Sequence, residues 1–114
     1  IPVPLHWRRK QWRQGNQAHE LAREFSAQTG LPLQQSLRRI RATSTQTKLN
    51  RKQRLTNLRG AFRIRKSALA GLQGSTIILV DDVFTTGATA HECTKTLMKD
   101  AGVKQVIILT LVRG

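Results

Sequence analysis

The sequence predicts an α/β fold with a parallel sheet, because its C-terminal half reads as strand, helix, strand. Residues 76–80 are a continuous β-branched and apolar run, typical of a strand buried on both faces. Residues 89–101 have helical periodicity, and Gly102 follows as a helix stop. The apolar face of this helix is expected to contain Ala90, Cys93, Leu97, Met98 and Ala101. With a second apolar strand at 106–112, the spacing predicts a βαβ unit with a right-handed crossover.

The N-terminal half predicts shorter elements. A helix is expected to begin near Asn16, a good N-cap, and to end at Gly30. Residues 41–59 are polar, basic and without a clear period, which predicts a long mobile loop, with partial helix as the alternative. The other expected elements are a strand end at residues 1–4, a charged loop at 5–15, short strands at 33–40 and 61–65, and a turn at 69–74.

The charge of the chain is unevenly distributed along its 114 residues, a length that suits one domain. Residues 1–66 hold 16 Lys/Arg and two acids, whereas residues 67–114 hold four of each, so the first part carries the whole net charge of +14. Such a field attracts polyanions, either nucleic acid or a small ligand with several phosphates. A solvated basic surface fits the charge equally well.

Several features limit the setting of the protein. The first residue is Ile1 and not Met, so we expect a fragment of a larger protein. No stretch of 18 apolar residues predicts a membrane span, and no leader indicates secretion, so a cytoplasmic location is expected. The single cysteine, Cys93, excludes an internal disulfide and a cysteine-based zinc site within this chain.

The segment between the strand at 76–80 and the following helix has the character of a phosphate site. In open α/β sheets, ligands bind beyond the carboxyl ends of the strands, where a helix N-terminus presents backbone N–H groups to an anion. Gly87 can adopt the positive φ that turns several N–H groups inward, and Thr85, Thr86 and Thr89 offer hydroxyl donors. The lysine of a Walker loop is missing, which argues against a nucleoside triphosphate.

Two adjacent acids, Asp81 and Asp82, precede this loop. Neighbouring carboxylates at a strand end repel each other and are costly to desolvate. The two hydroxyls of a ribose, with Mg²⁺ close by, would make the pair favourable. In the alternative interpretation, Asp81 is a loop residue and Asp82 caps the helix.

The run VDDVFTTGAT resembles the phosphoribosyl diphosphate (PRPP) motif of type I phosphoribosyltransferases. The resemblance implies a three-layer α/β/α fold with a parallel sheet, and a site that binds PRPP together with Mg²⁺. By the same resemblance, Asp81 and Asp82 would hold the ribose 2′- and 3′-hydroxyls. The 5-phosphate would be bound by Thr85, Thr86, Gly87, Ala88 and Thr89.

The rest of the chain is similar to the ComF/GntX group of phosphoribosyltransferase-like proteins, which is linked to competence and DNA uptake or use. The group's pattern is met by Arg41, Thr43, Gln46, Leu49, Arg54, Asn57, Ala61 and Phe62. The group usually reads RGFNQ where this chain has Arg13-Gln14-Gly15-Asn16-Gln17. Residues 1–114 would therefore form one phosphoribosyltransferase-like domain, without the N-terminal zinc-binding segment that members usually carry.

The resemblance also implies where the diphosphate of PRPP would lie. An early loop contacts the diphosphate in phosphoribosyltransferases, and a flexible loop closes over the site and excludes water. The first loop would correspond to residues 4–9 and the second to residues 41–59. The candidate residues for the diphosphate are Leu5, His6, Arg8, Arg9, Lys48, Arg51 and Arg54, although each cation taken alone fits a solvated surface equally well.

Other residues carry weaker signals. Thr85 stands where purine-salvage relatives have an acid, and a threonine is no general base at neutral pH, so a hypoxanthine- or guanine-using enzyme is not expected. The layout is closer to amidophosphoribosyltransferases, but Cys93 falls on an apolar helix face and is expected in the core rather than as a glutaminase nucleophile. No metal-ligand spacing links His6, His19 and His91. Trp7 and Trp12 fit a loop anchor, or stacking on bases.

Two functions follow from these observations. In the first, the chain is a phosphoribosyltransferase that transfers the phosphoribosyl group of PRPP to an unknown acceptor. In the second, it is a non-catalytic DNA-uptake module whose basic half contacts single-stranded DNA or a protein of the competence machinery. No hood for a base can be recognised in the sequence, so a hood would come from other residues or from a second subunit of a homo-oligomer.

Overall fold

The computed structural model describes residues 1–4, 16–41, 50–84 and 87–113. Its elements, in chain order, are α2 (Gln17–Thr29), β1 (Leu37–Arg39), α3 (Arg51–Leu58), β2 (Phe62–Ile64), the 3₁₀ turn η1 (Lys66–Ala68), α4 (Leu69–Leu72), β3 (Thr76–Phe84), α5 (Ala88–Ala101) and β4 (Gln105–Arg113).

The parallel pair β3 and β4 is the main sheet of the described chain. Ile77 lies opposite Val106, and the register continues to Asp81 opposite Thr110. The first residues of the chain pair with the other edge of β3: the Val3 N–H donates to the Val80 carbonyl at 2.8 Å, and Pro2 bridges Val80 in parallel. The predicted parallel sheet, with residues 1–4 as a strand end, is therefore confirmed.

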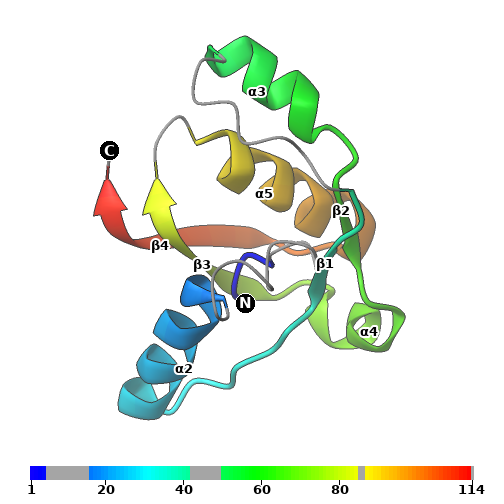
Figure 1. Ribbon diagram of the computed structural model, residues 1–114. Helices are drawn as coiled ribbons and strands as arrows, with labels where there is room; N and C mark the ends of the chain where they lie inside the picture. Colours follow the sequence, from blue (N-terminus) through cyan, green and yellow to red (C-terminus); the bar gives the residue numbers. More distant parts are fainter. Residues whose placement is uncertain (5–15, 42–49, 85–86, 114) are drawn as a thin grey trace.

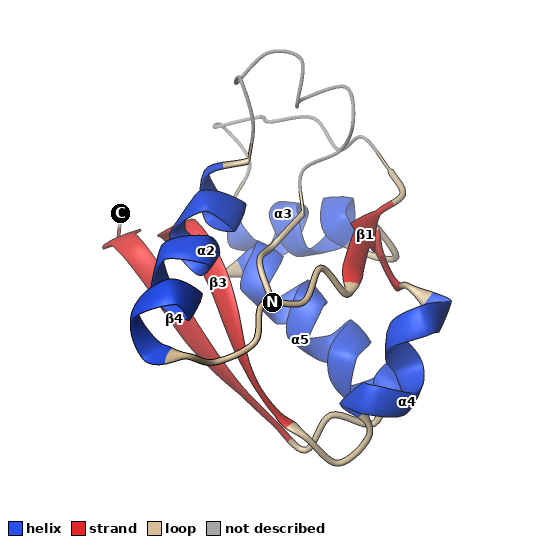
Figure 2. Ribbon diagram, turned by 90° about the horizontal axis from the view of Figure 1, so that it is seen from below, coloured by secondary structure: helices blue, strands red, loops and turns tan. Residues whose placement is uncertain are grey.

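Helices cover the two faces of this sheet. Figure 1 shows α2 beneath β3 and β4, with α5 above them, and the view from below in Figure 2 places α2 in front of the strands and α5 behind. This arrangement confirms the α/β fold with three layers that the sequence predicted. It also places the helix that follows β3 directly against that strand.

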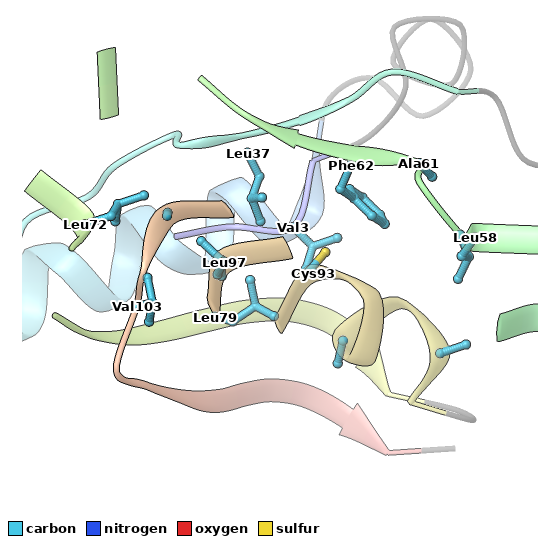
Figure 3. Close-up of a cluster of buried hydrophobic side chains, with 13 residues drawn as sticks. Val3, Leu37, Leu58, Ala61, Phe62, Leu72, Leu79, Cys93, Leu97 and Val103 are labelled. Atoms are coloured by element: carbon cyan, nitrogen blue, oxygen red, sulfur yellow. The ribbon is translucent and has the colours of Figure 1, made fainter. Parts of the chain in front are cut away.

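A second layer of packing covers the outer side of α5. Strands β1 and β2 form an antiparallel ribbon in which Leu37 pairs with Ile64 and Arg38 with Arg63. The apolar side of the ribbon turns inward, and Leu37 and Phe62 are each only 2% exposed. Figure 3 shows the resulting core, whose labelled side chains are Val3, Leu37, Leu58, Ala61, Phe62, Leu72, Leu79, Cys93, Leu97 and Val103.

Helix α2 begins and ends where the sequence predicted. The Asn16 side chain accepts the Ala18 N–H at 3.0 Å, and its amide donates to the Val3 carbonyl at 3.0 Å. One residue thus caps the helix and attaches it to the strand segment at the N-terminus. At the other end, Gly30 has a φ of 77°, the left-handed conformation that closes a helix.

The region predicted as a mobile loop contains a helix, α3. Asn50 accepts the Gln53 N–H at 2.8 Å, and the Gln53 side chain accepts the Asn50 N–H at 3.0 Å, forming a capping box. Residues 42–49 lie outside the described part. The predicted strand at 33–40 is confined to Leu37–Arg39, and the predicted turn at 69–74 was wrong, because Leu69–Leu72 are helical.

The apolar pattern of the C-terminal half also needed correction in two places. Met98, expected on the buried face of α5, is 45% exposed, whereas Leu97 is fully buried. Strand β4 borders β3 on one side, and in the described chain its Ile107 and Leu111 are 47% and 72% exposed. The apolar run at 106–112 therefore marked a strand correctly but overstated its burial.

We predict that Leu97→Ala lowers the free energy of unfolding by about 3 kcal/mol, because it leaves a cavity among packed side chains. Met98→Ala is the matched control one residue further along the same helix, and it should change stability by less than about 1 kcal/mol, since Met98 is 45% exposed. Urea denaturation measures both. Equal losses for the two variants would contradict the placement of this helix face.

Candidate functional site

The two acids lie in the last part of β3, which continues to Phe84 rather than ending at Val80 as predicted. Successive side chains of a strand point to opposite faces of the sheet, so Asp81 and Asp82 diverge. Asp81 is only 9% exposed and faces the layer that contains α5, whereas Asp82 is half-buried. Because the two carboxylates point to opposite faces, they repel each other less than their adjacent positions in the sequence suggested.

The surroundings of Asp81 are shared with Cys93 of α5. The pKa of the Cys93 thiol is raised well above its ordinary value, first by burial and then by the negative charge of Asp81. Cys93 is 0% exposed and is a free thiol. The interpretation of Cys93 as a core residue is therefore confirmed, since a nucleophile needs an accessible thiolate.

The loop after β3 leads into α5 through Gly87. Gly87 has a φ of 80°, the left-handed conformation predicted for this position, and its carbonyl accepts the His91 N–H at 2.8 Å. Ala88 is buried and Thr89 is half-buried, so the first turn of α5 is packed against the domain. Thr85 and Thr86 lie outside the described residues. The positive end of the α5 dipole therefore lies directly beyond the acid-bearing strand, where it favours an anion.

The proposed diphosphate residues fall into two groups. Leu5, His6, Arg8, Arg9 and Lys48 lie outside the described part of the chain, as do Trp7 and Trp12. Arg51 and Arg54 belong to α3, which runs over α5. In Figure 1 both helices begin on the side toward which the arrows of β3 and β4 point. The structure therefore places the start of α3 on the same side of the domain as the start of α5.

Glu92, one turn into α5, is a residue that the sequence analysis missed. Its side chain is 3% exposed, and its Oε1 accepts the Gly60 N–H at 3.0 Å while Lys95 Nζ lies 3.3 Å from Oε2. Helical spacing gave no warning, because Glu92 lies roughly 200° around the helix from Ala90, on the side away from the expected apolar face. The one available signal in the sequence was that Glu92 is the single acid in residues 88–94, the first two turns of the helix.

His19 and His91, the two histidines in the described part of the chain, have separate surroundings. His19 Nε2 lies 2.9 Å from the Gln35 side-chain amide, and His91 is exposed on α5. Across the described ranges, no three His, Cys, Asp or Glu side chains form a group that could hold a metal ion.

Comparison with known families agrees with the arrangement of strand, acid pair, loop and helix. Residues 2–114 match the family model of the phosphoribosyl transferase domain, and the chain belongs to that family. Within it the chain is similar to Competence protein F of Haemophilus influenzae, with 40% identity over the whole chain and 49% of that protein. It is 32% identical to Competence protein ComFC of Bacillus subtilis, again over the whole chain and over 44% of that protein. The resemblance to the ComF group is thus confirmed.

A further relative is the DNA utilization protein YhgH of Salmonella typhi, which is 37% identical over 88% of the chain and 43% of that protein. The chain therefore spans about half the length of the curated relatives it matches. No solved structure matches the chain. Among the described helices, none has the length and apolar character needed to cross a membrane.

We predict that Cys93 makes stability fall with rising pH above its ordinary pKa of 9.0. The folded chain keeps the thiol proton because its pKa is raised, whereas the unfolded chain releases it, so the unfolded state binds fewer protons. Between pH 9 and the raised folded pKa, wild type should lose about 1.4 kcal/mol of unfolding free energy per pH unit relative to Cys93→Ala. Urea denaturation at pH 8, 9 and 10 measures this difference. Parallel pH profiles for the two proteins would refute it.

Proposed function

We propose that the chain binds PRPP through VDDVFTTGAT and transfers its phosphoribosyl group to an acceptor, in a protein linked to competence and DNA uptake or use. The observation that carries this proposal is the sequence of parts at the end of β3. Two acids on a parallel strand are followed within a few residues by a left-handed glycine and the first turn of a helix. The chain's membership of the phosphoribosyl transferase domain family supports the interpretation of that arrangement as a phosphoribosyl site.

The ligand divides into three parts with different needs. The 5-phosphate requires N–H and hydroxyl donors, which residues 85–89 offer at the positive end of α5. The ribose hydroxyls require acceptors, which the carboxylates of Asp81 and Asp82 provide. The diphosphate requires cations, and the first turns of α3 carry Arg51, Lys52 and Arg54. In this division, the basic residues 1–66 supply the cations for the diphosphate, and the neutral residues 67–114 supply the groups for the ribose and the 5-phosphate.

The carboxylates also fit the metal that accompanies PRPP. Mg²⁺ prefers a few carboxylate oxygens and completes its coordination with water and phosphate oxygens. Asp81 and Asp82 would supply such oxygens, and the ion would neutralise diphosphate charge. This donor set would hold Mg²⁺ together with the ligand rather than in a protein cage.

The reaction is a substitution at C1 of the ribose. The acceptor's lone pair forms a bond to C1 while the bond from C1 to the diphosphate oxygen breaks, and the diphosphate leaves with that electron pair. Positive charge develops on the ribose ring and negative charge on the leaving group, so fixed cations lower the barrier. Thr85 cannot remove a proton at neutral pH. An acceptor that can attack C1 without first losing a proton therefore suits this site.

We predict that Asp82→Asn weakens PRPP binding in the presence of Mg²⁺ by about tenfold or more, because a charged acceptor for a ribose hydroxyl is lost. Asp100→Asn is the matched control, since it removes the same charge from an exposed position at the far end of α5. Isothermal titration calorimetry measures both. The proposal fails if wild type shows no binding, or if the Asp82 variant binds as well as the Asp100 variant.

A second candidate function is the binding of single-stranded nucleic acid by the basic half. Arg38 and Arg63 are exposed and lie directly opposite each other on the outer side of the β1–β2 ribbon. Like charges at such positions destabilise a strand pair, and the chain has no acid between Glu24 and Asp81 to offset them. A polyanion on this side would remove the repulsion, and relatives are named for competence and DNA utilization.

We predict that the logarithm of the single-stranded DNA association constant falls linearly with the logarithm of salt concentration, because phosphate contacts release counterions. The double variant Arg38→Gln/Arg63→Gln should make the slope shallower by about 1.4, corresponding to two lost contacts. Arg23→Gln is the control, since Arg23 is exposed but paired with Glu20 at 2.7 Å. Fluorescence anisotropy at several salt concentrations measures the slopes. A salt-independent affinity would exclude this function.

A further inference from the structure

Glu92 is a buried carboxylate that neither proposed function uses. At 3% exposure it has lost nearly all contact with water, which is costly for an ionised group unless protein groups replace the solvent. Two groups do so: the Gly60 N–H donates to Oε1 at 3.0 Å, and Lys95 Nζ lies 3.3 Å from Oε2. Gly60 belongs to the connection between α3 and β2, so the carboxylate joins that connection to α5.

The contacts of Glu92 fall where α3 ends. Leu58, the last residue of α3, is 7% exposed and lies in the core, as Figure 3 shows. The Arg41 guanidinium donates to the carbonyls of Asn57 and Arg59, at 2.5 and 2.7 Å, and so binds the C-terminal carbonyls of the helix. With Glu92 holding the next residue, Gly60, the C-terminal end of α3 is attached to the domain from two sides.

The opposite end of α3 carries the cations. Arg51, Lys52 and Arg54 lie in its first turns, and Figure 1 shows that α3 and α5 begin on the same side of the domain. A helix is stiff over eight residues, so the attachment at its C-terminal end sets the position of its first turns. Glu92 follows the phosphate loop on α5 by little more than one turn, and it therefore joins the two parts of the expected PRPP site.

We infer that Glu92 is a positioning residue that fixes the N-terminal end of α3, which has a basic sequence, relative to the first turn of α5, so that this end of α3 faces the diphosphate of PRPP. This inference rests on the proposed PRPP-binding function. It assigns Glu92 no contact with the ligand. It distinguishes the diphosphate end of the ligand, which depends on α3, from the 5-phosphate and ribose end, which depends on residues 81–89.

The test compares two ligands that differ only in the diphosphate, PRPP and ribose 5-phosphate, each with Mg²⁺ and the full-length protein. Glu92→Ala should weaken PRPP binding by about tenfold, because misplacing a binding group costs affinity steeply, and should change ribose 5-phosphate binding by less than about twofold. Glu92→Gln keeps an oxygen that can accept the Gly60 N–H and should restore most of the PRPP affinity. Asp100→Ala is the control for charge removal from α5. Calorimetry measures the affinities, and circular dichroism verifies folding.

The outcomes separate the inference from the function on which it rests. If wild type binds neither ligand, the PRPP function fails and the inference fails with it. If wild type binds both but Glu92→Ala weakens both ligands equally, or neither, Glu92 does not position α3 for the diphosphate and the inference alone is overturned. Should Glu92→Ala not fold, Glu92→Asp keeps the charge but shortens the side chain by one methylene, and the same selective loss for PRPP is required of it.

A second comparison verifies the route of the effect. In a background of Arg51→Gln/Arg54→Gln, the cations that Glu92 is inferred to position are gone. Glu92→Ala should then cause no further loss of PRPP affinity, since two changes acting through one group are not additive. An additive loss would show that Glu92 acts by another route and would overturn the inference.

Discussion

The burial of α5 between two sheets is the constraint on which the rest of the domain depends. On one side its apolar residues pack against β3, and on the other against the β1–β2 ribbon, with Cys93 and Leu97 fully enclosed. Because α5 cannot shift without opening both contacts, its first turn has a fixed place beyond the end of β3. The position of Gly87 and of the first turn of α5 therefore depends on this packing.

The two sides of α5 carry different parts of the expected ligand site. Strand β3 brings the acids, and the helix dipole of α5 brings a partial positive charge beside them. The far side of α5 supports α3 through Glu92 and Leu58.

The sequence predicted the elements whose signals are local. Asn16 and Gly30 bound α2 because capping and the left-handed conformation depend on a few neighbouring atoms, and the parallel strands followed from two apolar runs at βαβ spacing. Helix α3 was predicted only as the alternative to a mobile loop, although Asn50 and Gln53 form a recognisable capping box, because its polar sequence has no apolar period. Its position is set by tertiary contacts at one end, and these do not show in periodicity.

The candidate site was predictable in kind but not in geometry. The acid pair, the glycine and the helix start could be read from the motif, and Gly87 has the expected conformation. The divergence of the Asp81 and Asp82 side chains could not be predicted from the motif, because it depends on β3 continuing past Val80. Glu92 was also beyond reach, because its importance lies in the Gly60 N–H, 32 residues away in the chain.

Cys93 has a consequence for how the domain responds to oxidants. It is the single cysteine of the chain, and burial together with the Asp81 charge keeps its thiol protonated. Oxidation to a sulfenic acid or a mixed disulfide proceeds through an accessible thiolate. The single thiol of this chain is therefore protected from oxidants as long as α5 stays packed.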